Sequence, residues 1–394
     1  MNVCHIVSTF PRALDDPEVP WLLQCIRRLK EKGLEVKVFA PAFKGLRDQE
    51  ISGISVHRFR YFFRRWENLT HDEGAPNKLR KNPLYIFVAI FYILFGVIDI
   101  IRYCHRERFD ILHVHWPFPH GIFGMIGGQI CGARVILNFH GAELLLVQKH
   151  PLIRPCIRFF LHHADSVIAN SSFTRERIVE IERQPVEVIP FGAAVEEKRY
   201  TKSKDPVKTI LFVGRLIERK GVEYLIRAMP HVLAKVNAKL IIVGEGHQRP
   251  VLEKLIVQKR LNRAVKLTGK VSDEVLREWY AGCDVFVLPS IVDARGDTEG
   301  LGIVLLEALS YKKPVVASKV GGIPDITIHG ETGLLVPQKD SHALAESILR
   351  VLMDETFARR LGARGYKYVK ERFSWERITY QIIHLYRDVI EYQI

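Results

Sequence analysis

The stretch Glu299-Gly-Leu-Gly-Ile-Val-Leu-Leu-Glu307 decides how the rest of this sequence is interpreted. It separates two carboxylates by a glycine-rich turn and an apolar run with helical character. Just upstream, Asp284-Val-Phe-Val-Leu-Pro-Ser290 has the pattern of a buried strand that ends in a loop. The order of strand, loop, glutamate, glycine turn and helix predicts an α/β unit with a parallel sheet.

A helix that begins at Gly300–Gly302 would offer free backbone N–H groups and the positive end of its dipole to a phosphate. The glycines would let a ligand approach the backbone closely. Glu299 would lie at the mouth of this site, and Glu307 two turns into the helix, about 12 Å further along its axis. This spacing favours a ligand with hydroxyl groups at both ends and phosphates between them, as in a nucleotide-sugar. A surface helix with two solvated glutamates is the alternative interpretation.

Composition narrows the class of protein. The chain has 394 residues, enough for two or three domains, and its 47% hydrophobic and 26% charged residues are typical of a globular protein. The net charge of +14 favours an anionic partner: a nucleotide ligand, an acidic membrane surface or nucleic acid. Nucleic acid is not expected, because the sequence has no zinc-finger spacing, RNA-binding aromatic motif or basic tail. The six cysteines include no CxxC pair, which is typical of a reduced, cytosolic protein without a disulfide framework.

The first half of the chain predicts one α/β unit. Val3–Ser8 has the pattern of a strand rather than a signal peptide, Trp21–Lys32 that of a helix, and Leu34–Ala40 that of a second strand. The loop after the first strand, with Thr9 and Phe10, would face a ligand. It has no GxGxxG motif, so no dinucleotide cofactor is expected.

A basic and aromatic span, Arg58–Lys81, precedes the apolar run Leu84–Ile98. We favour a buried helix packed on the sheet for this run. The second interpretation is a helix that lies on a membrane surface beside the basic span. A transmembrane span is the third and least favoured interpretation. The run is shorter than the roughly 20 residues needed, and a strand of the same sheet follows it.

Two strands in this half end in histidines. Phe109–His115 contains His113 and His115, which alternate and could point to one face. Arg134–Asn138 leads to His140, beyond the carboxyl end of a strand, where open α/β sheets bind ligands. His140 could transfer a proton or hold a substrate hydroxyl, or it could be a structural loop histidine.

The second half begins with a polar, basic linker at 200–208 and then repeats the α/β pattern. Thr209–Val213 predicts a strand and Val222–Leu233 a helix. Arg215 and Lys220 lie between them, where two cations would suit a diphosphate. Solvated turn cations are the alternative. Further strands are predicted at Lys239–Val243, Val265–Thr268 and Pro314–Ala317, with helices around 340–352, 354–370 and 375–390.

The sequence therefore predicts three segments. Residues 1–199 and 200–374 each form an α/β unit, and residues 375–394 form a C-terminal helix. A ligand is expected in the cleft between the two domains.

With these features in place, the chain resembles a glycosyltransferase of family 4 with the GT-B architecture, in which two Rossmann-like, doubly wound parallel-sheet domains face each other across a cleft. The segments that carry the resemblance are, in order, Phe139-His140-Gly141, Val188-Ile-Pro-Phe-Gly192, Val213-Gly-Arg-Leu216 with Lys220-Gly221, Val243-Gly-Glu-Gly246, Glu299 to Glu307, Gly321-Gly-Ile-Pro324 and Thr332-Gly-Leu-Leu-Val-Pro337.

The resemblance implies a retaining transfer of a sugar from a UDP- or GDP-linked donor to a hydroxyl acceptor, with no cofactor and no metal. It also implies that residues 1–199 form an acceptor-binding domain, that residues 200–374 form a nucleotide-sugar-binding domain, and that the helix at 375–394 crosses back onto the first domain. Asp293-Ala-Arg-Gly-Asp297 is the nearest approach to a metal-binding acidic pair, and we interpret it as a sugar-side or acceptor-side loop. The implied catalytic residues are His140, Arg215, Lys220 and Glu299. The implied donor-binding residues are Gly214, Arg215, Lys220, Gly244, Val271, Glu299, Gly300, Leu301, Gly302, Ile303 and Glu307. The implied acceptor-side residues are Thr9, Phe10, His115 and Glu143.

Two departures from the family pattern are visible: the loop at Thr9 lacks paired glycines, and Phe191 stands where a small or polar residue is common. The basic, apolar first domain suggests a lipid-linked or saccharide acceptor, a protein bound peripherally to the inner face of the cell membrane, and a part in surface polysaccharide or glycolipid assembly. The alternatives are an epimerase or phosphorylase on the same fold, and a non-catalytic sugar-nucleotide-binding or membrane-scaffold protein.

Overall fold

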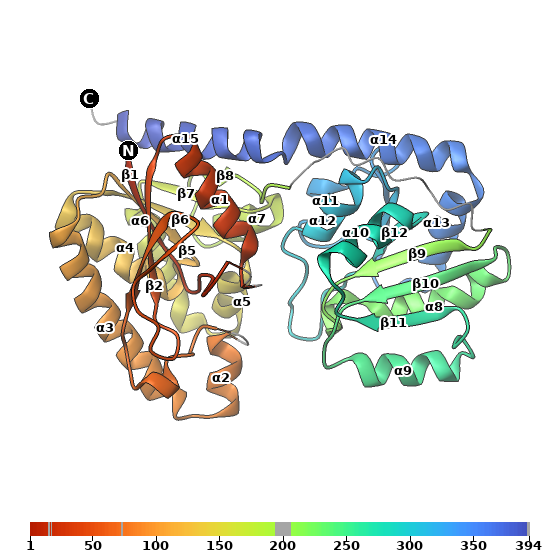
Figure 1. Cartoon of the computed structure of the whole chain (residues 1–394), viewed down its shortest axis with the longest axis horizontal. Helices are drawn as coiled ribbons and strands as arrows, with labels where there is room; N and C mark the ends of the chain where they lie inside the picture. The colour runs from red at the N-terminus through yellow and green to blue at the C-terminus, as the bar shows by residue number, and fades with distance from the viewer. Residues whose placement is uncertain (15, 17, 72–73, 194–205, 392–394) are drawn as a thin grey trace. The chain divides into compact units, whose positions relative to one another are not determined.

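The computed structural model describes residues 1–14, 16, 18–71, 74–193 and 206–391 (Figure 1). The chain divides into two compact units: unit 1 is Met1–Pro190 with Ile378–Ile394, and unit 2 is Phe191–Arg377. Each unit contains one largely parallel sheet with helices packed on it, which confirms the two predicted α/β units. The boundary expected between residues 199 and 200, and most of the linker expected at 200–208, lie outside the described residues.

The sheet of unit 1 has eight strands in the order β3-β4-β2-β1-β5-β6-β7-β8. Neighbouring strands are parallel except for β3 and β4, which pair antiparallel. The strands are β1 Asn2–Ile6, β2 Glu35–Pro41, β3 Gln49–Ile51, β4 Ile54–Phe59, β5 Ile111–His115, β6 Arg134–Phe139, β7 Ser166–Ala169 and β8 Glu187–Val188. The β3–β4 pair extends the sheet beyond the strands that the sequence predicted.

The strand order of unit 1 reverses between β1 and β5. The chain runs outward from β1 to β2 and β4, then returns to place β5 against the other side of β1. Open parallel sheets bind ligands at the carboxyl ends of the strands where the order reverses. His5 in β1 pairs in register with His113 in β5, so the predicted histidine strand lies at this point.

Helices cover the sheet of unit 1 and enclose an apolar core. Helix α4 packs on β5 and β6, and α3 packs on α4. Phe39, Phe59, Tyr92 and Phe123 form a buried cluster of aromatic rings between these elements. The helices are α1 Pro20–Glu31, α2 Ala75–Lys81, α3 Tyr85–Arg106, α4 Pro117–Cys131, α5 Ala142–Lys149, α6 Arg154–His163, α7 Ser172–Val179 and the part of α15 (Trp375–Glu391) that belongs to unit 1.

Helix α3 is buried on one side only. Its buried residues recur about every fourth position: Val88, Tyr92, Gly96, Ile100, Tyr103 and Cys104. A Cβ atom on Gly96 would lie 2.4 Å from the ring of Phe123, so this face packs tightly on α4. Large apolar side chains on the other face are exposed: Ile86, Phe87, Ile90, Phe91, Leu94 and Phe95. The prediction of a buried helix is therefore wrong for this outer face.

The sheet of unit 2 has six parallel strands in the order β11-β10-β9-β12-β13-β14. They are β9 Lys208–Val213, β10 Ala238–Val243, β11 Val265–Gly269, β12 Val285–Leu288, β13 Val315–Ser318 and β14 Leu334–Val336. The chain runs from β9 outward to β11 and returns at β12, so the strand order reverses between β9 and β12. The loops that follow these two strands carry Lys220 and Glu299.

The helices of unit 2 are α8 Val222–Leu233, α9 Arg249–Gln258, α10 Asp273–Gly282, α11 Ile303–Ser310, α12 Ile323–Ile326, α13 Ser341–Met353 and α14 Glu355–Arg372. Several begin as their sequences indicate: the side chains of Ser272, Asp340 and Asp354 cap α10, α13 and α14 by accepting backbone N–H bonds. The predicted bounds of α8 coincide with the observed ones.

Candidate active site

A buried ion pair joins the two loops at the reversal point of unit 2. Lys220 closes the short 3₁₀ helix Glu218–Lys220 that follows β9, and Glu299 follows β12. The Lys220 Nζ donates a hydrogen bond to Glu299 Oε2 at 2.5 Å, and the Ser290 hydroxyl donates to the same oxygen at 3.3 Å. Both charged residues are less than a tenth exposed. The structure therefore brings together two residues that the sequence assigned separately.

Arg219 is a site residue that the sequence reasoning missed. Its guanidinium lies 3.4 Å from Glu299 and 3.3 Å from Asp297, and it donates to the Thr298 carbonyl at 3.2 Å. Arg219 thus fastens the loop that carries Glu299. The signal was present in the sequence, because three cations follow β9 within one loop. Asp297 belongs to the acidic segment that the sequence suggested lines the sugar or acceptor side.

The charges of this cluster stabilise one another. Burial alone would raise the pKa of Glu299, but Lys220 and Arg219 outweigh burial and hold this pKa at about 2. Burial lowers the pKa of Lys220, and Glu299 opposes that effect. Arg215 is exposed and interacts electrostatically with Arg219, Glu299 and Asp297, so it lies at the edge of the same cluster. The cluster offers positive charge that one buried carboxylate holds in place.

The two glutamates of the deciding stretch are closer along the helix than the sequence suggested. Helix α11 begins only at Ile303, because Gly302 precedes it with φ +92°, a left-handed conformation that favours glycine. Glu307 therefore lies about one turn, or about 6 Å, into the helix. The prediction of two turns and 12 Å is wrong, because the residues from Glu299 to Gly302 form a turn. The interpretation as two solvated glutamates is also wrong, since Glu299 is buried and Glu307 is half-buried.

Tyr280 positions Glu307. The Tyr280 hydroxyl, from α10, donates to Glu307 Oε2 at 2.6 Å. Burial raises the pKa of Glu307 although the hydrogen bond from Tyr280 opposes it, and Lys220 is near enough to interact with the same carboxylate. Tyr280 was not predicted, because nothing in its local sequence distinguishes it from a core tyrosine.

Three predicted donor residues follow adjacent strands. Gly214 follows β9, Gly244 follows β10 and Val271 follows β11, so they lie along one edge of the sheet. A Cβ atom on Gly244 would lie 2.0 Å from the Gly214 carbonyl oxygen, which explains the glycine at this close backbone contact. The predicted N–H groups at Gly300–Ile303 precede or begin α11, where helical amides have no acceptor within the helix.

The predicted residues of unit 1 form a separate set around His140. Its ring lies 5.1 Å from that of Trp21 and 4.6 Å from that of Trp116, measured between centroids. The His140 backbone N–H donates to Glu143 Oε1 at 2.6 Å, and His115 Nδ1 lies 3.2 Å from His140 Nε2. The structure thus places His115, His140 and Glu143 close together at the carboxyl ends of the strands of the unit 1 sheet.

Glu143 is a buried carboxyl group in this set, only 2% exposed. Burial raises its pKa to about 7, against the effect of three backbone N–H groups nearby. Its Oε2 atom is buried and has no hydrogen-bond partner among the described residues. Glu143 therefore changes protonation state near neutral pH.

A buried arginine holds the first loop of unit 1 in place. Arg58 is buried, and its guanidinium donates to the carbonyl oxygens of Phe10 and Pro11. The side chain of Phe10 is fully buried and Thr9 is 5% exposed. The Phe10 ring therefore packs in the core, and any contact that Phe10 makes with an acceptor comes from its backbone.

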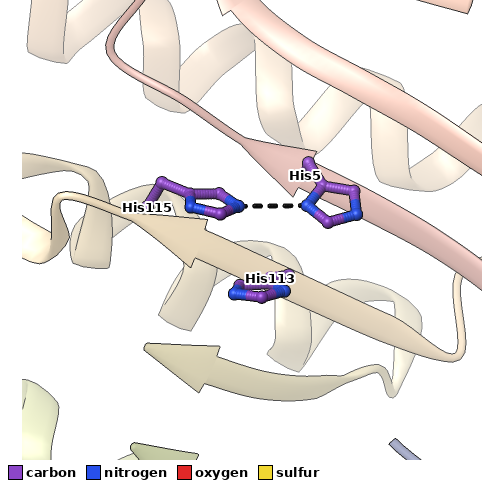
Figure 2. Close-up of side chains that lie close together, drawn as sticks. All are labelled: His5, His113 and His115. Atoms are coloured by element: carbon purple, nitrogen blue, oxygen red, sulfur yellow. Dashed lines mark hydrogen bonds between the residues drawn. The ribbon is translucent and has the colours of Figure 1, made fainter. Parts of the chain in front are cut away.

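Two groups of side chains in the described part of the chain have ligand atoms close enough together to hold a metal ion. One is the buried trio His5, His113 and His115 (Figure 2). The other is His231, His342 and Glu346, which is partly exposed, and there Lys235 already contacts Glu346 at 3.1 Å. The sequence predicted neither group.

The geometry defines a two-unit α/β protein with a cluster of cationic side chains around a buried glutamate in unit 2. Residues 21–197 match the family described as Glycosyltransferase Family 4, and residues 195–368 match Glycosyl transferases group 1. An uncharacterized glycosyltransferase of Methanocaldococcus jannaschii is 33% identical over 92% of this chain and 92% of its own. The chain belongs to the family 4 glycosyltransferases and is a glycosyl-transferring enzyme.

Two further similarities are informative. A GDP-mannose-dependent monoacylated alpha-(1-6)-phosphatidylinositol monomannoside mannosyltransferase of Corynebacterium glutamicum is 36% identical over 78% of this chain and 83% of its own. The structure of Anabaena HepE in complex with UDP and glucose superposes with a TM-score of 0.72, at 18% identity, over 98% of this chain and 100% of its own. This similarity of fold confirms the predicted GT-B architecture.

Proposed function

We propose that this enzyme transfers a sugar from a UDP- or GDP-linked donor to a hydroxyl group of a saccharide or lipid-linked acceptor, with retention of anomeric configuration and without a metal ion. The observation that carries the proposal is the buried Lys220–Glu299 pair, with Arg215 and Arg219, beside the start of α11. The name of the Corynebacterium relative specifies a GDP-linked donor and a glycolipid acceptor, and HepE was solved with UDP.

The cluster suits a departing nucleoside diphosphate. As the bond from the anomeric carbon to the phosphate oxygen breaks, negative charge grows on the diphosphate. Lys220, Arg215 and the start of α11 supply fixed positive charge to stabilise it. Glu299 holds Lys220 in place through one oxygen, and a carboxylate retains further acceptor capacity for sugar hydroxyls. This stabilisation needs no metal ion.

The other donor contacts follow from the same edge of the sheet. Glu307, held by Tyr280, accepts hydrogen bonds from the ribose hydroxyls. The base packs near Gly244 and Val271, after β10 and β11. His140 contacts the donor sugar, and Thr9, Phe10, His115 and Glu143 belong to the acceptor side.

Retention follows from a reaction on one face of the sugar. The acceptor oxygen forms a bond to the anomeric carbon on the side from which the diphosphate departs. The acceptor proton passes to an oxygen of the leaving phosphate, so the bonds and charges balance without a protein nucleophile.

A donor panel tests the proposal. UDP- and GDP-linked glucose, galactose, mannose and N-acetylglucosamine are assayed for binding and hydrolysis, with and without EDTA. We expect saturable binding of one donor, unaffected by EDTA and lost in Glu307→Ala but kept in Glu253→Ala, an exposed glutamate of α9. Loss of binding in EDTA would contradict the metal-free scheme, and binding without turnover would favour the non-catalytic alternative. NMR of the product reports the anomeric configuration.

We also propose that the outer face of α3 rests on the acidic, cytoplasmic surface of the cell membrane. Helix α3 has 22 residues and by length and composition alone could cross a membrane, but its inner face is packed on α4. The ring centroids of Phe62 and Phe91 lie 5.3 Å apart, so the segment Phe62–Arg65 lies beside the exposed face. Phe63 is 74% exposed, and Arg64 and Arg65 are exposed next to it. Apolar side chains bordered by cations match an anionic lipid surface.

Vesicle flotation tests this surface. The wild-type protein is expected to float with phosphatidylglycerol vesicles and much less with phosphatidylcholine vesicles. Phe87→Ser with Ile90→Ser removes two exposed apolar side chains and is expected to abolish flotation. Val251→Ser with Val257→Ser removes two equally exposed side chains from α9 and is the matched control. Equal flotation of both double variants would contradict the proposal.

A further inference from the structure

Three side chains of the kinds that bind metals meet on the surface of unit 2, where α8 packs on α13. His231 lies near the end of α8, and His342 and Glu346 lie one helical turn apart on α13. One nitrogen of each imidazole and one oxygen of the carboxylate lie within 4.8 Å of one another. The ring centroids of the two histidines are 5.1 Å apart, and His231 Nε2 is hydrogen-bonded to Glu346 Oε1. We call these three side chains the surface triad.

The core holds the two helices that carry the surface triad. Residues i and i+4 of a helix lie on the same face, which places His342 beside Glu346. Val232 and Ala345, which adjoin His231 and Glu346 in the sequence, are both fully buried, and α8 and α13 pack against each other. An ion bound by the surface triad would therefore link two helices whose backbones are already fixed.

Two imidazoles and one carboxylate form a ligand set that suits zinc. Zn²⁺ binds imidazole nitrogen and carboxylate oxygen at about 2.0–2.2 Å, and three protein ligands leave a fourth position for water. Ligand atoms around one tetrahedral ion are then about 3.4 Å apart. The surface triad is close to this spacing, because its ligand atoms already lie within 4.8 Å. Mg²⁺ prefers an all-oxygen set, so the surface triad discriminates between the two ions.

Lys235 is the cation that competes for this place. Its Nζ lies 3.1 Å from Glu346 Oε1, and both side chains are 46% exposed. Hydrogen bonds from His231 and Lys235 lower the pKa of Glu346, so the carboxylate is ionised, as a metal ligand must be. An exposed ion pair contributes little, because solvent screens it and side-chain entropy opposes it. Zn²⁺ would therefore displace Lys235 into solvent at little cost.

The buried histidines of unit 1 are less suited to a metal ion. His113 is engaged on both sides: its Nδ1 lies 2.6 Å from the Tyr386 hydroxyl, and its Nε2 lies 3.2 Å from Asn138 Nδ2. Its ring faces that of His115 at 4.4 Å and 12°, and Figure 2 shows it below the His5–His115 bond. Metal ligation uses the in-plane lone pair of an imidazole, and lone pairs in two such parallel planes do not converge on one ion.

We propose that His231, His342 and Glu346 bind one Zn²⁺ ion, which ties α8 to α13 and stabilises unit 2. The folded helices bring together ligands that the unfolded chain leaves apart, so binding favours the folded state. The ion lies away from the chemistry. Lys220 precedes the start of α8 at Val222, whereas His231 lies about 14 Å further along the helix axis. Zn²⁺ at the surface triad therefore takes no part in sugar transfer.

Calorimetric titration of the metal-free, full-length protein with Zn²⁺ tests the site. The wild-type protein is expected to bind one ion at the surface triad, and Mg²⁺ is expected not to compete. His342→Ala and Glu346→Gln should each weaken this binding more than about tenfold, since loss of even an outer-shell partner costs about 10–100-fold. His105→Ala, which removes an exposed histidine of α3, is the control and should keep it. No binding by wild type, or equal binding by both triad variants, would overturn the proposal and leave only the ion pair of Glu346 with His231 and Lys235.

Thermal unfolding with and without Zn²⁺ separates a bound ion from a structural effect of the substitutions. Zn²⁺ at about 100 times its Kd should raise the Tm of wild type by roughly 5–10 °C, and that of Glu346→Gln by less than about 1 °C. Equal shifts in the two proteins would overturn the proposal. Lys235→Met removes the competing cation and should bind Zn²⁺ more tightly; weaker binding would overturn Glu346 as a ligand. Removal of Zn²⁺ should leave kcat and donor KM unchanged, and a loss of turnover would overturn the assignment of the ion to a place away from the chemistry.

Discussion

The carboxyl edges of the two sheets share one topological feature but differ in charge: the edge of unit 2 is charged, and that of unit 1 is largely neutral. In each unit the strand order reverses once, between β1 and β5 in unit 1 and between β9 and β12 in unit 2. The edge of unit 2 holds full charges, with Glu299 ionised between Lys220 and Arg219. The edge of unit 1 holds buried groups that burial drives toward their neutral forms, such as His140 and Glu143.

This difference separates what the fold supplies from what the side chains supply. The reversal of strand order supplies an accessible edge in both units. Partnered charges suit a ligand that is itself charged, such as a diphosphate. Neutral donors and acceptors can pair with hydroxyl groups without leaving a buried charge unpaired. Four substitutions test this contrast, from the largest expected effect to the smallest.

Glu299→Gln is expected to cost about 3–5 kcal/mol of unfolding free energy, because it leaves Lys220 buried with its counter-ion removed. Urea denaturation of unit 2 measures the change. The control is Glu253→Gln, which breaks an exposed pair with Arg249 and should change stability by less than about 0.5 kcal/mol. The folded pKa of Glu299 lies below its usual 4.5, so its contribution is complete above pH 4.5 and declines as the pH falls toward 2. If Glu299→Gln and Glu253→Gln lowered the unfolding free energy equally, the paired charges at the edge of unit 2 would not differ from an exposed ion pair, and the contrast with the neutral edge of unit 1 would be lost.

Under the proposed mechanism, Lys220→Met is expected to lower kcat/KM for the donor by about 10²–10³, because it removes a cation assigned to stabilise the departing diphosphate. Steady-state kinetics with the donor identified by the panel measures the loss. Lys254→Met, which removes an exposed cation of α9, is the control. A loss of less than about fivefold would show that Lys220 serves only to neutralise Glu299. Combining Lys220→Met with Glu299→Gln should destabilise less than the sum of the single changes, since the two residues form one pair.

Glu143→Gln tests the neutral edge through pH. The folded pKa of Glu143, about 7, lies above its ordinary 4.5, so the folded state binds more protons between these pH values and stability falls as the pH rises through them. The Glu143→Gln variant does not lose this stability, because a glutamine side chain does not titrate. Its unfolding free energy, relative to wild type, should therefore rise by up to about 3 kcal/mol between pH 4.5 and pH 8. Urea denaturation at the two pH values measures it, and a difference that does not vary with pH would contradict the buried, neutral carboxyl.

Tyr280→Phe should have the smallest effect. It removes the hydrogen bond to Glu307 but keeps the ring, so a stability loss of about 1 kcal/mol and a few-fold weaker donor binding are expected. Isothermal titration with the donor measures the binding. Tyr311→Phe, on the ring that stacks against Tyr280, is a comparison that keeps this hydrogen bond. Weakening by Tyr311→Phe as large as that by Tyr280→Phe would assign the effect to packing.

Local sequence predicted most of the regular structure. The helix Val222–Leu233 has the predicted bounds, and the predicted strands of both units are found within a few residues. Periodicity and glycine turns depend on neighbours a few positions apart, which a sequence displays directly. Local sequence also identified Lys220 and Glu299 as candidate site residues, since each follows a strand whose end can be recognised in the sequence. The predicted distance of Glu307 along the helix was wrong, because the helical spacing was counted from Glu299 through a glycine turn that is not part of the helix.

The sequence by itself determined two α/β units, the strand ends that carry candidate residues, and a cationic site beside a helix start. Only the tertiary structure decided which of those residues meet. His5 and His115 are 110 positions apart, and Lys220 and Glu299 are 79 apart. Their contacts depend on strand order and on the register between parallel neighbours, which the long crossover connections leave open. The exposed face of α3 was decided in the same way, because periodicity marks one buried stripe but not what covers the other side.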